Sequence, residues 1–447
     1  MATEKGKKDA GKQPKKSTEK SGGGKGGSGG SGSGGSGPSQ PEYAGDNIRL
    51  GAAGQSLFTK SAVVGAVGLA AAVGLGASAN DGFHRFSLSY TTAYCWVLAL
   101  GLGALFWVTL QNLVNAHWSI VLRRVGELLA AQAPILAILA LPVVVPIFTG
   151  SSSIYAWSNA HELEHNHVLQ HKASYLNPTF FLIRFVIYFG FWTLLSRFFL
   201  NSSLAQDSSK DSPSIVAKMR AVAGPGMIVW GLTMTFCAFD LLMSLDKIWF
   251  STMFGVYFLA SCVLSINSFL PLAAMWLQKR GVLTKSVTTE HYHDLGKMMF
   301  AFTVFWAYIG FSQFMLLWYA NIPEETAWFK LRFTGGWTSG WGLHSAVLLF
   351  GHFVIPFFGL ISRHIKRKKP TLAFWAVWQL TMIYLDMYWL VMPYADPSSP
   401  PFALIDVFCV AGVLGVFIAG AALRAKNLNL MPTNDPRLPK SLAFENL

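Results

Sequence analysis

Ionisable and hydrogen-bonding residues that interrupt the apolar runs of this chain are the first candidates for chemistry. Asp240 belongs to a polar series at intervals of four, three and four residues, which lies on one face of a helix. Asp386 and Gln379 are seven residues apart and share a helix face in the same way. Polar groups are costly in lipid and usually face a bundle interior or a water-filled cavity. The series around Asp240 consists of Thr233, Cys237, Asp240 and Ser244.

These residue types suit proton transfer. Burial can shift the pKa of a carboxyl group toward neutral pH, and the unperturbed pKa of His already lies near working pH. We therefore expect Asp240 and Asp386 to titrate, His344 to relay protons, and Arg184 to hold a neighbouring Asp ionised. The structural alternative is a buried ion pair between Arg184 and an Asp. The candidate site residues are Arg184, Asp240, Asp246, Tyr308, Gln313, His344 and Asp386, together with His117 and Glu127, which either serve the inner side or cap helices.

The segment His161–His165 has the HExxH spacing, which on a helix can hold zinc with the Glu as general base. His167 and His171 offer two further ligands. The segment lies in a connection between apolar runs, and no ligand from another segment is evident. We expect no functional metal here.

The cysteine and histidine pattern argues against a redox centre within this chain. The four Cys are isolated inside apolar runs, with none of the CxxC spacings of iron–sulfur or c-type haem sites. His344 and His352 lie in one apolar run, eight residues apart, and cannot both ligate one haem. We expect no covalently bound cofactor. The cysteines are Cys95, Cys237, Cys262 and Cys409.

The composition indicates that helices in a membrane position these groups. Of 447 residues, 52% are hydrophobic and only 13% charged, whereas about a quarter are charged in soluble domains. The net charge of +13 does not indicate nucleic-acid binding, because eight Lys lie in the first 25 residues with no aromatic side chain between them.

Ten apolar segments approach the ~20 residues that a membrane-spanning helix needs. We expect Pro142 and Pro146 to kink the third, and Gly224–Gly226 to mark the start of the fifth. The fold class is therefore an all-α polytopic membrane protein. The ten segments are 57–79, 90–113, 127–149, 178–200, 222–244, 250–277, 296–320, 338–362, 371–393 and 403–424.

The charges of the connections give the orientation. With the N-terminus inside, the inner connections and termini carry 27 Lys and Arg and the outer connections carry five. We expect both termini in the cytoplasm, with a disordered Lys/Gly/Ser-rich tail over residues 1–56 and a C-terminal tail over 426–447. The basic run 363–369 is expected to anchor the chain at lipid head groups.

Three long motifs carry a resemblance to a known family. They are Leu169–Arg184, Asp240–Tyr257 (DLLMSLDKIWFSTMFGVY) and His293–Glu325, which contains GFSQFMLLWYANIPEE. They resemble the ActF-type membrane subunits of bacterial alternative complex III, which are related to the NrfD and PsrC subunits. The resemblance covers about residues 57–430. It implies two four-helix bundles flanked by the first and last helices, in the bacterial inner membrane.

The resemblance also implies a function. Such complexes oxidise quinol and pass electrons to an outer iron–sulfur subunit and a multi-haem cytochrome c, beside an ActC-like membrane subunit. The ligand would be a quinone such as menaquinone, haems and iron–sulfur clusters would lie in the partners, and the polar residues would serve quinol binding or a proton path. Three alternatives stay open: the ActC-like quinol-binding subunit itself, a secondary transporter, which should show paired helix breaks, and a purely structural anchor.

Overall fold

The computed structural model describes residues 42–446 except residue 44, so the expected disorder of residues 1–41 lies outside the described residues. Two short strands, β1 (Glu42–Tyr43) and β2 (Asp46–Asn47), form an antiparallel pair before the first helix. The helices of the first half are α1 (Ala52–Ser78), α2 (His84–Leu113), α3 (Ile120–Ala130), α4 (Ala133–Leu139), α5 (Leu141–Thr149), α6 (Ala160–His165), α7 (His167–Lys172), α8 (Pro178–Gln206) and α9 (Ser212–Leu241).

Helices also make up the second half. A π-helical turn, Leu348–Val354, joins α13 to α14 within one membrane-sized segment. The helices are α10 (Phe254–Lys279), α11 (Thr289–Ala320), α12 (Pro323–Leu331), α13 (Gly340–Val347), α14 (Ile355–Ile361), α15 (Arg363–Arg367), α16 (Lys369–Val391), α17 (Leu404–Ala425) and α18 (Leu438–Leu442).

Among the described residues, nine helical segments are long and apolar enough to cross a membrane, by length and composition. The all-α polytopic membrane class is thereby confirmed. The predicted span 371–393 forms α16 but is not among the nine, because Gln379, Asp386 and several Trp and Tyr lower its mean hydropathy. The nine are α1, α2, α3–α5 together, α8, α9 with the turn after it, α10, α11, α13–α14 and α17.

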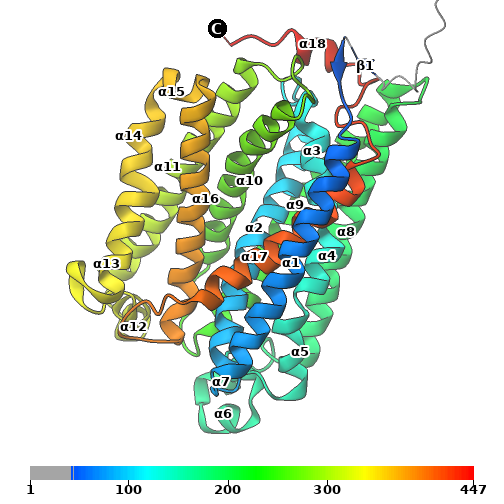
Figure 1. Ribbon diagram of the computed structural model, residues 1–447. Helices are drawn as coiled ribbons and strands as arrows, with labels where there is room; N and C mark the ends of the chain where they lie inside the picture. The colour runs from blue at the N-terminus through cyan, green and yellow to red at the C-terminus, as the bar shows by residue number, and fades with distance from the viewer. Residues whose placement is uncertain (1–41, 44, 447) are drawn as a thin grey trace, which may run out of the picture. The chain divides into compact units, whose positions relative to one another are not determined.

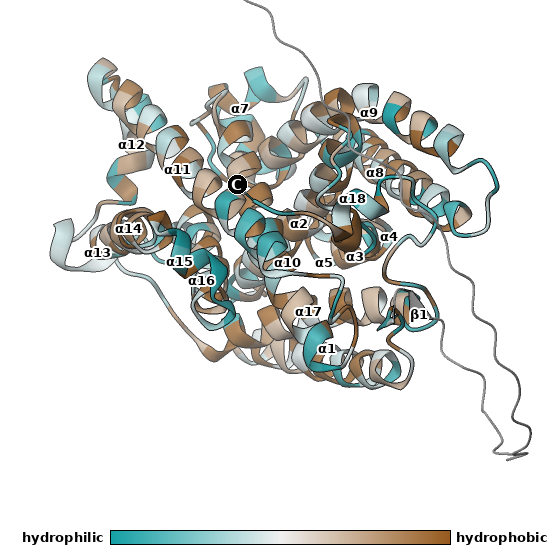
Figure 2. Ribbon diagram, turned by 90° about the horizontal axis from the view of Figure 1, so that it is seen from above, coloured by the Kyte–Doolittle hydropathy of each residue, from teal (hydrophilic) through white to brown (hydrophobic). Residues whose placement is uncertain are grey.

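The helices surround α2 and α10, which are the most deeply buried and pack on each other (Figure 2). The first and last spans, α1 and α17, lie side by side, and their backbones approach closely at glycines. A Cβ atom on Gly68 would lie 2.6 Å from the backbone nitrogen of Gly412, so neither position has room for a side chain. Figure 1 shows α15, α18 and β1 at one end of the helices and α6, α7 and α12 at the other. We call these the basic end and the opposite end.

Prolines were expected to shape the third and fifth spans, and the structure differs from the prediction at both. The fifth span does not begin at Gly224–Gly226: α9 begins at Ser212 and continues through Pro225. A transmembrane helix tolerates proline where its surroundings satisfy the freed backbone groups. The third span is divided before Pro142, as expected, but also before Pro134, while Pro146 lies inside α5.

The end of the predicted N-terminal tail is docked. Asp46 accepts hydrogen bonds from the backbone N–H groups of Thr284, Lys285 and Ser286 at 2.8–2.9 Å and from two of their hydroxyls. The backbone of Ile48 pairs with Leu430 at 2.8 Å. Residues 46–50 therefore form a strap that joins the α10–α11 loop to the C-terminal segment, which is itself packed and ends in α18. Disorder was expected over residues 1–56 because a Lys/Gly/Ser-rich stretch buries too little apolar surface to offset its ordering entropy; residues 46–50 are ordered instead by bonds to distant segments.

Replacing Asp46 with Ala is expected to lower the free energy of unfolding by about 2 kcal/mol, because several buried donors lose a charged acceptor. Burial alone would raise the pKa of Asp46, but the hydrogen bonds from Ser286, Lys285 and Thr284 outweigh it and hold the pKa below its ordinary value. The carboxylate's contribution is thus complete above the ordinary Asp pKa and is lost as pH falls through the lowered folded-state value. Thermal unfolding in detergent at several pH values measures this, with exposed Glu164→Ala as the control. An Asp46→Ala protein as stable as the control would contradict it.

Candidate functional site

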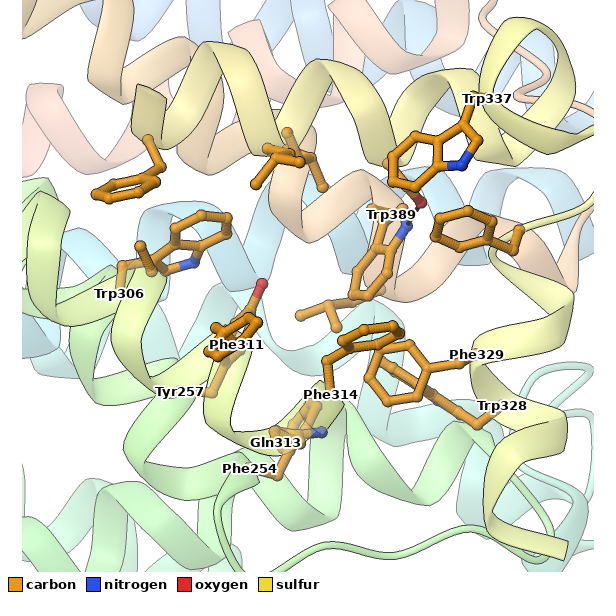
Figure 3. A pocket seen from close by; sticks show the side chains of 18 residues that line it. Phe254, Tyr257, Trp306, Phe311, Gln313, Phe314, Trp328, Phe329, Trp337 and Trp389 are labelled. Carbon is orange, nitrogen blue, oxygen red and sulfur yellow. Dashed lines mark hydrogen bonds between the residues drawn. The ribbon is translucent and has the colours of Figure 1, made fainter. Parts of the chain in front are cut away.

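An aromatic pocket lies between α10, α11, α12, α13 with its π-helical turn, and α16, toward the opposite end. Its volume is about 410 Å³, within the range typical of small-molecule sites. Figure 3 shows its aromatic side chains arranged around the cavity. The rings that form most of its wall are Trp306, Phe314, Trp328, Phe329, Trp337 and Trp389.

The pocket reaches the outer surface of the helix bundle. Phe311, Leu349 and Trp337 line the cavity and are also exposed, so the pocket opens between α11 and the π-helical turn. Phe311 and Leu349 belong to two membrane-sized segments, and Trp337 lies in the connection between them. Gly310 keeps space beside the pocket, since its Cβ would lie 3.3 Å from the Tyr257 ring.

Besides Ser345, whose hydroxyl already donates one hydrogen bond and accepts another, two polar side chains distinguish this pocket from a simple apolar groove. The Tyr257 hydroxyl donates a hydrogen bond to Asp386 Oδ1, behind the pocket wall. Gln313 is buried at the pocket, and its side-chain oxygen has no hydrogen-bond partner among the described residues. Both groups can bind an oxygen-bearing ring ligand, while the aromatic walls stack on its face.

Asp386 is fully buried and held by neutral donors. Trp306 Nε1 donates to Oδ2 at 3.1 Å and the Ser261 hydroxyl at 3.4 Å, besides the bond from Tyr257. Among the described residues no Lys, Arg or His forms an ion pair with Asp386. Its charge is therefore not balanced by a cation among the described residues.

Polar groups continue from Asp386 toward the basic end. The His352 ring stacks on Trp306 with 3.9 Å between ring centroids, and both of its nitrogens are buried without a partner among the described residues. Gln379 donates to the Thr303 hydroxyl at 2.7 Å. The π-helical turn contains His352 at this position, and such turns often occur at functional sites. The sequence indicated His352 only as a deep histidine, and gave no sign of its contact with Trp306.

Asp240 has a different environment. Arg184 donates to both of its carboxylate oxygens, at 2.9 and 2.8 Å, and Tyr188 donates to Oδ2 at 2.9 Å. The guanidinium group also donates to the Tyr175 carbonyl at 2.8 Å and lies 3.8 Å from the Tyr175 ring centroid. The structure thus contains the ion pair that the sequence left as an alternative. It joins α8 to α9, in a different part of the bundle from Asp386.

The remaining candidates near the opposite end are spread around these two clusters. His344 Nε2 contacts the Leu385 carbonyl at 3.0 Å and does not bond to the Asp386 carboxyl group. Asp246 accepts a hydrogen bond from Tyr394 at 3.0 Å and caps the following loop. Tyr308 is 65% exposed and belongs to neither cluster, because two residues of helix turn it away from Trp306.

Glu127 and His117 lie near the basic end. Glu127 pairs with Arg123 at 3.0 Å, and Arg123 also bonds Asp435 at 2.6 Å, so the C-terminal segment is tied to α3. Hydrogen bonds from Arg437 and the positive charges of Arg123 and Arg437 outweigh burial and hold the pKa of Asp435 well below its ordinary value. His117 is half-buried and separate from this network. The structure does not bring these two residues together with the pocket.

A buried cation lies behind the pocket wall. Arg332 donates to the carbonyl groups of Trp389, Trp328 and Leu390 at 2.7–3.1 Å and stacks 3.6 Å from the Trp328 ring centroid. Burial lowers the pKa of this guanidinium group. These carbonyl groups take the place of hydrating water around the guanidinium group. The bonds to Trp389 and Leu390 hold the end of α12 against α16. The sequence indicated it only as an outer-loop charge.

The HExxH segment forms α6, and α7 follows it. His161 and His165 stack with 4.5 Å between ring centroids, and both are exposed. Among the described residues, no group of three or more His, Cys, Asp or Glu side chains is placed to hold a metal ion.

Comparison with known proteins adds no assignment: no protein-family model and no curated protein matches this sequence. The candidate site is therefore defined by its own geometry, an aromatic pocket with exposed lining residues beside a buried Tyr–Asp pair.

Proposed function

We propose that this chain is the ActF-type membrane subunit of a quinol:acceptor oxidoreductase and binds a quinone or quinol ring in the aromatic pocket. The observation that carries the proposal is the lateral opening of a ring-lined cavity beside Tyr257, Asp386 and Gln313. A lipid-soluble ring can enter through the opening, stack on the tryptophans and bond its oxygens to Tyr257 and Gln313.

In this proposal the described residues move protons and leave electron transfer to partner subunits. Oxidation of a quinol to a quinone releases two electrons and two protons. The hydroxyl bound at Tyr257 gives its proton to the Tyr257 oxygen as Tyr257 passes its own proton to Asp386 along the existing hydrogen bond, and the second proton follows the same path after Asp386 has released the first. The electrons leave to an iron–sulfur or multi-haem cytochrome c subunit. The ion pair keeps Asp240 in a structural role.

The topology completes the proposal. The ten spans consist of the nine apolar segments and α16, arranged as two four-helix bundles with α1 and α17 at the side. The basic end then faces the cytoplasm of a bacterial inner membrane, as the charge count predicts.

Orientation can be measured with single introduced cysteines, because the four native cysteines are buried. Lys368→Cys is expected to resist a membrane-impermeant maleimide added outside intact cells, while Glu164→Cys at the opposite end is labelled. Both positions are exposed, so exposure does not explain a difference. Labelling of residue 368 but not residue 164 would show that the orientation is reversed.

Binding can be tested by filling the pocket. Ala307→Trp places a large ring in the cavity and is expected to weaken binding of 2,3-dimethyl-1,4-naphthoquinone at least about tenfold, measured by quenching of tryptophan fluorescence. Ala301→Trp is the matched control, because Ala301 is exposed on the same helix. Equal binding by both variants would contradict the proposed pocket. If neither variant bound the naphthoquinone, its binding site would not be specific to the pocket, and the proposal would be contradicted as well.

A further inference from the structure

The connection from α14 to α16 brings many cations together at the basic end. Six cations lie here with two carboxylates, since Arg367 pairs with Glu290 and Lys297 with Asp294. The other four cations form no ion pair among the described residues. The cations are Lys297, Arg363, Lys366, Arg367, Lys368 and Lys369.

Lys366 differs from the other cations because it is fixed in place. Only 7% of it is exposed, and its ammonium group contacts the Ile361 carbonyl at 3.3 Å and lies 5.3 Å from the Phe300 ring centroid. Its stem lies over Gly296, where a Cβ would be 2.9 Å from Lys366 Cγ. The lysine thus has a preformed position, and its ammonium group retains hydrogen-bonding capacity.

A second buried polar group lies in the same place. His293 is 7% exposed, and its Nδ1 atom has no partner among the described residues. Burial and the nearby Lys297 lower the pKa of the Lys366 ammonium group. Lys297 has Asp294 as its partner, whereas Lys366 forms no ion pair among the described residues and would gain most from an anion.

The surface beside these cations is apolar. Ile355, Phe358 and Ile361 recur every three residues on α14 and are all exposed, and the last directly precedes Ser362 and Arg363. Phe374 on α16 is exposed as well. An apolar stripe that ends at cations matches the chemistry of a lipid with acyl chains and a charged head group.

We propose that Lys366, with His293 and Lys297, binds the phosphate of an anionic glycerophospholipid whose acyl chains lie along α14. The site is specific in position, unlike a diffuse attraction of the basic run for a charged membrane. It does not depend on the proposed quinol site, since it lies on other residues at the other end of the helices.

The test uses the full chain in detergent and native mass spectrometry to measure retained lipid. Phosphatidylglycerol is expected to bind, and phosphatidylcholine is not. Lys366→Gln is expected to weaken phosphatidylglycerol binding about fivefold, and Lys368→Gln, which removes an exposed charge from the same run, by less than about twofold.

Gly296→Ala distinguishes a built site from charge alone, because it displaces the lysine stem without changing the net charge. It is expected to weaken phosphatidylglycerol binding as Lys366→Gln does. Equal effects of Lys366→Gln and Lys368→Gln, or no effect of Gly296→Ala, would overturn the specific site. If millimolar inorganic phosphate displaced phosphatidylglycerol, the ligand of this site would be a free anion and not a lipid.

Discussion

An Arg184→Met protein is expected to lose about 3–5 kcal/mol of stability, because the buried Asp240 carboxylate then lacks its cation. The bond between Arg184 and Asp240 is bidentate and almost completely buried, so solvent does not replace the lost partner. Tyr188 keeps one hydrogen bond to the carboxylate and cannot balance its charge. Thermal unfolding of the purified protein in detergent, together with the yield of folded protein, measures the loss.

Two further variants separate the ion pair from other effects. The double variant Arg184→Met, Asp240→Leu removes both charges and is expected to recover most of the stability. Arg197→Met lies on the same helix, is exposed, and should have little effect. If the single Arg184→Met protein were as stable as the Arg197→Met control, the pair would not stabilise the bundle.

Asp240→Asn decides between the two functions considered for Asp240. An ion-pair role predicts poor folding or assembly, because Arg184 is left without its counter-charge. A proton role predicts a well-assembled complex whose quinol oxidation or proton release is impaired. The geometry supports the first outcome.

Asp386→Asn is expected to reduce quinol oxidation by the assembled complex about 100-fold while leaving quinone binding nearly unchanged. The asparagine oxygen can still accept from Trp306 and Ser261, and its NH2 group can donate to the Tyr257 oxygen, but the side chain cannot take a proton. Unlike Asp240, Asp386 has no cation to lose, so folding should be little affected. Turnover with a soluble quinol, binding of the oxidised naphthoquinone and the thermal midpoint are measured on the same preparation.

The controls for this prediction address the pocket and the surface. Tyr257→Phe removes the hydroxyl that precedes Asp386 in the proposed proton path. It is expected to lower turnover as well and to weaken naphthoquinone binding modestly. Glu164→Gln changes an exposed carboxyl group and should alter neither quantity. Normal turnover and proton release in Asp386→Asn would exclude Asp386 from the proton path.

The sequence by itself determined the class of protein and the existence of most spans. Long apolar runs and few charges leave hydrogen-bonded helices as the form that satisfies the backbone in lipid. The periodicity around Asp240 and between Gln379 and Asp386 correctly predicted buried faces, since helix geometry fixes which residues share a face. The possibility of an Arg184–Asp ion pair was also evident from charge alone.

Only the tertiary structure decided which groups meet. Helix periodicity gives a face but not the neighbour opposite it, so the structure alone shows that the candidate residues belong to two clusters: Arg184 with Asp240, and Tyr257 with Asp386. The aromatic pocket has the same origin, because its rings come from several different helices, from Phe254 on α10 to Trp389 on α16. The docked strap at Asp46 depends on a loop about 240 residues away, and no local pattern can encode such a contact.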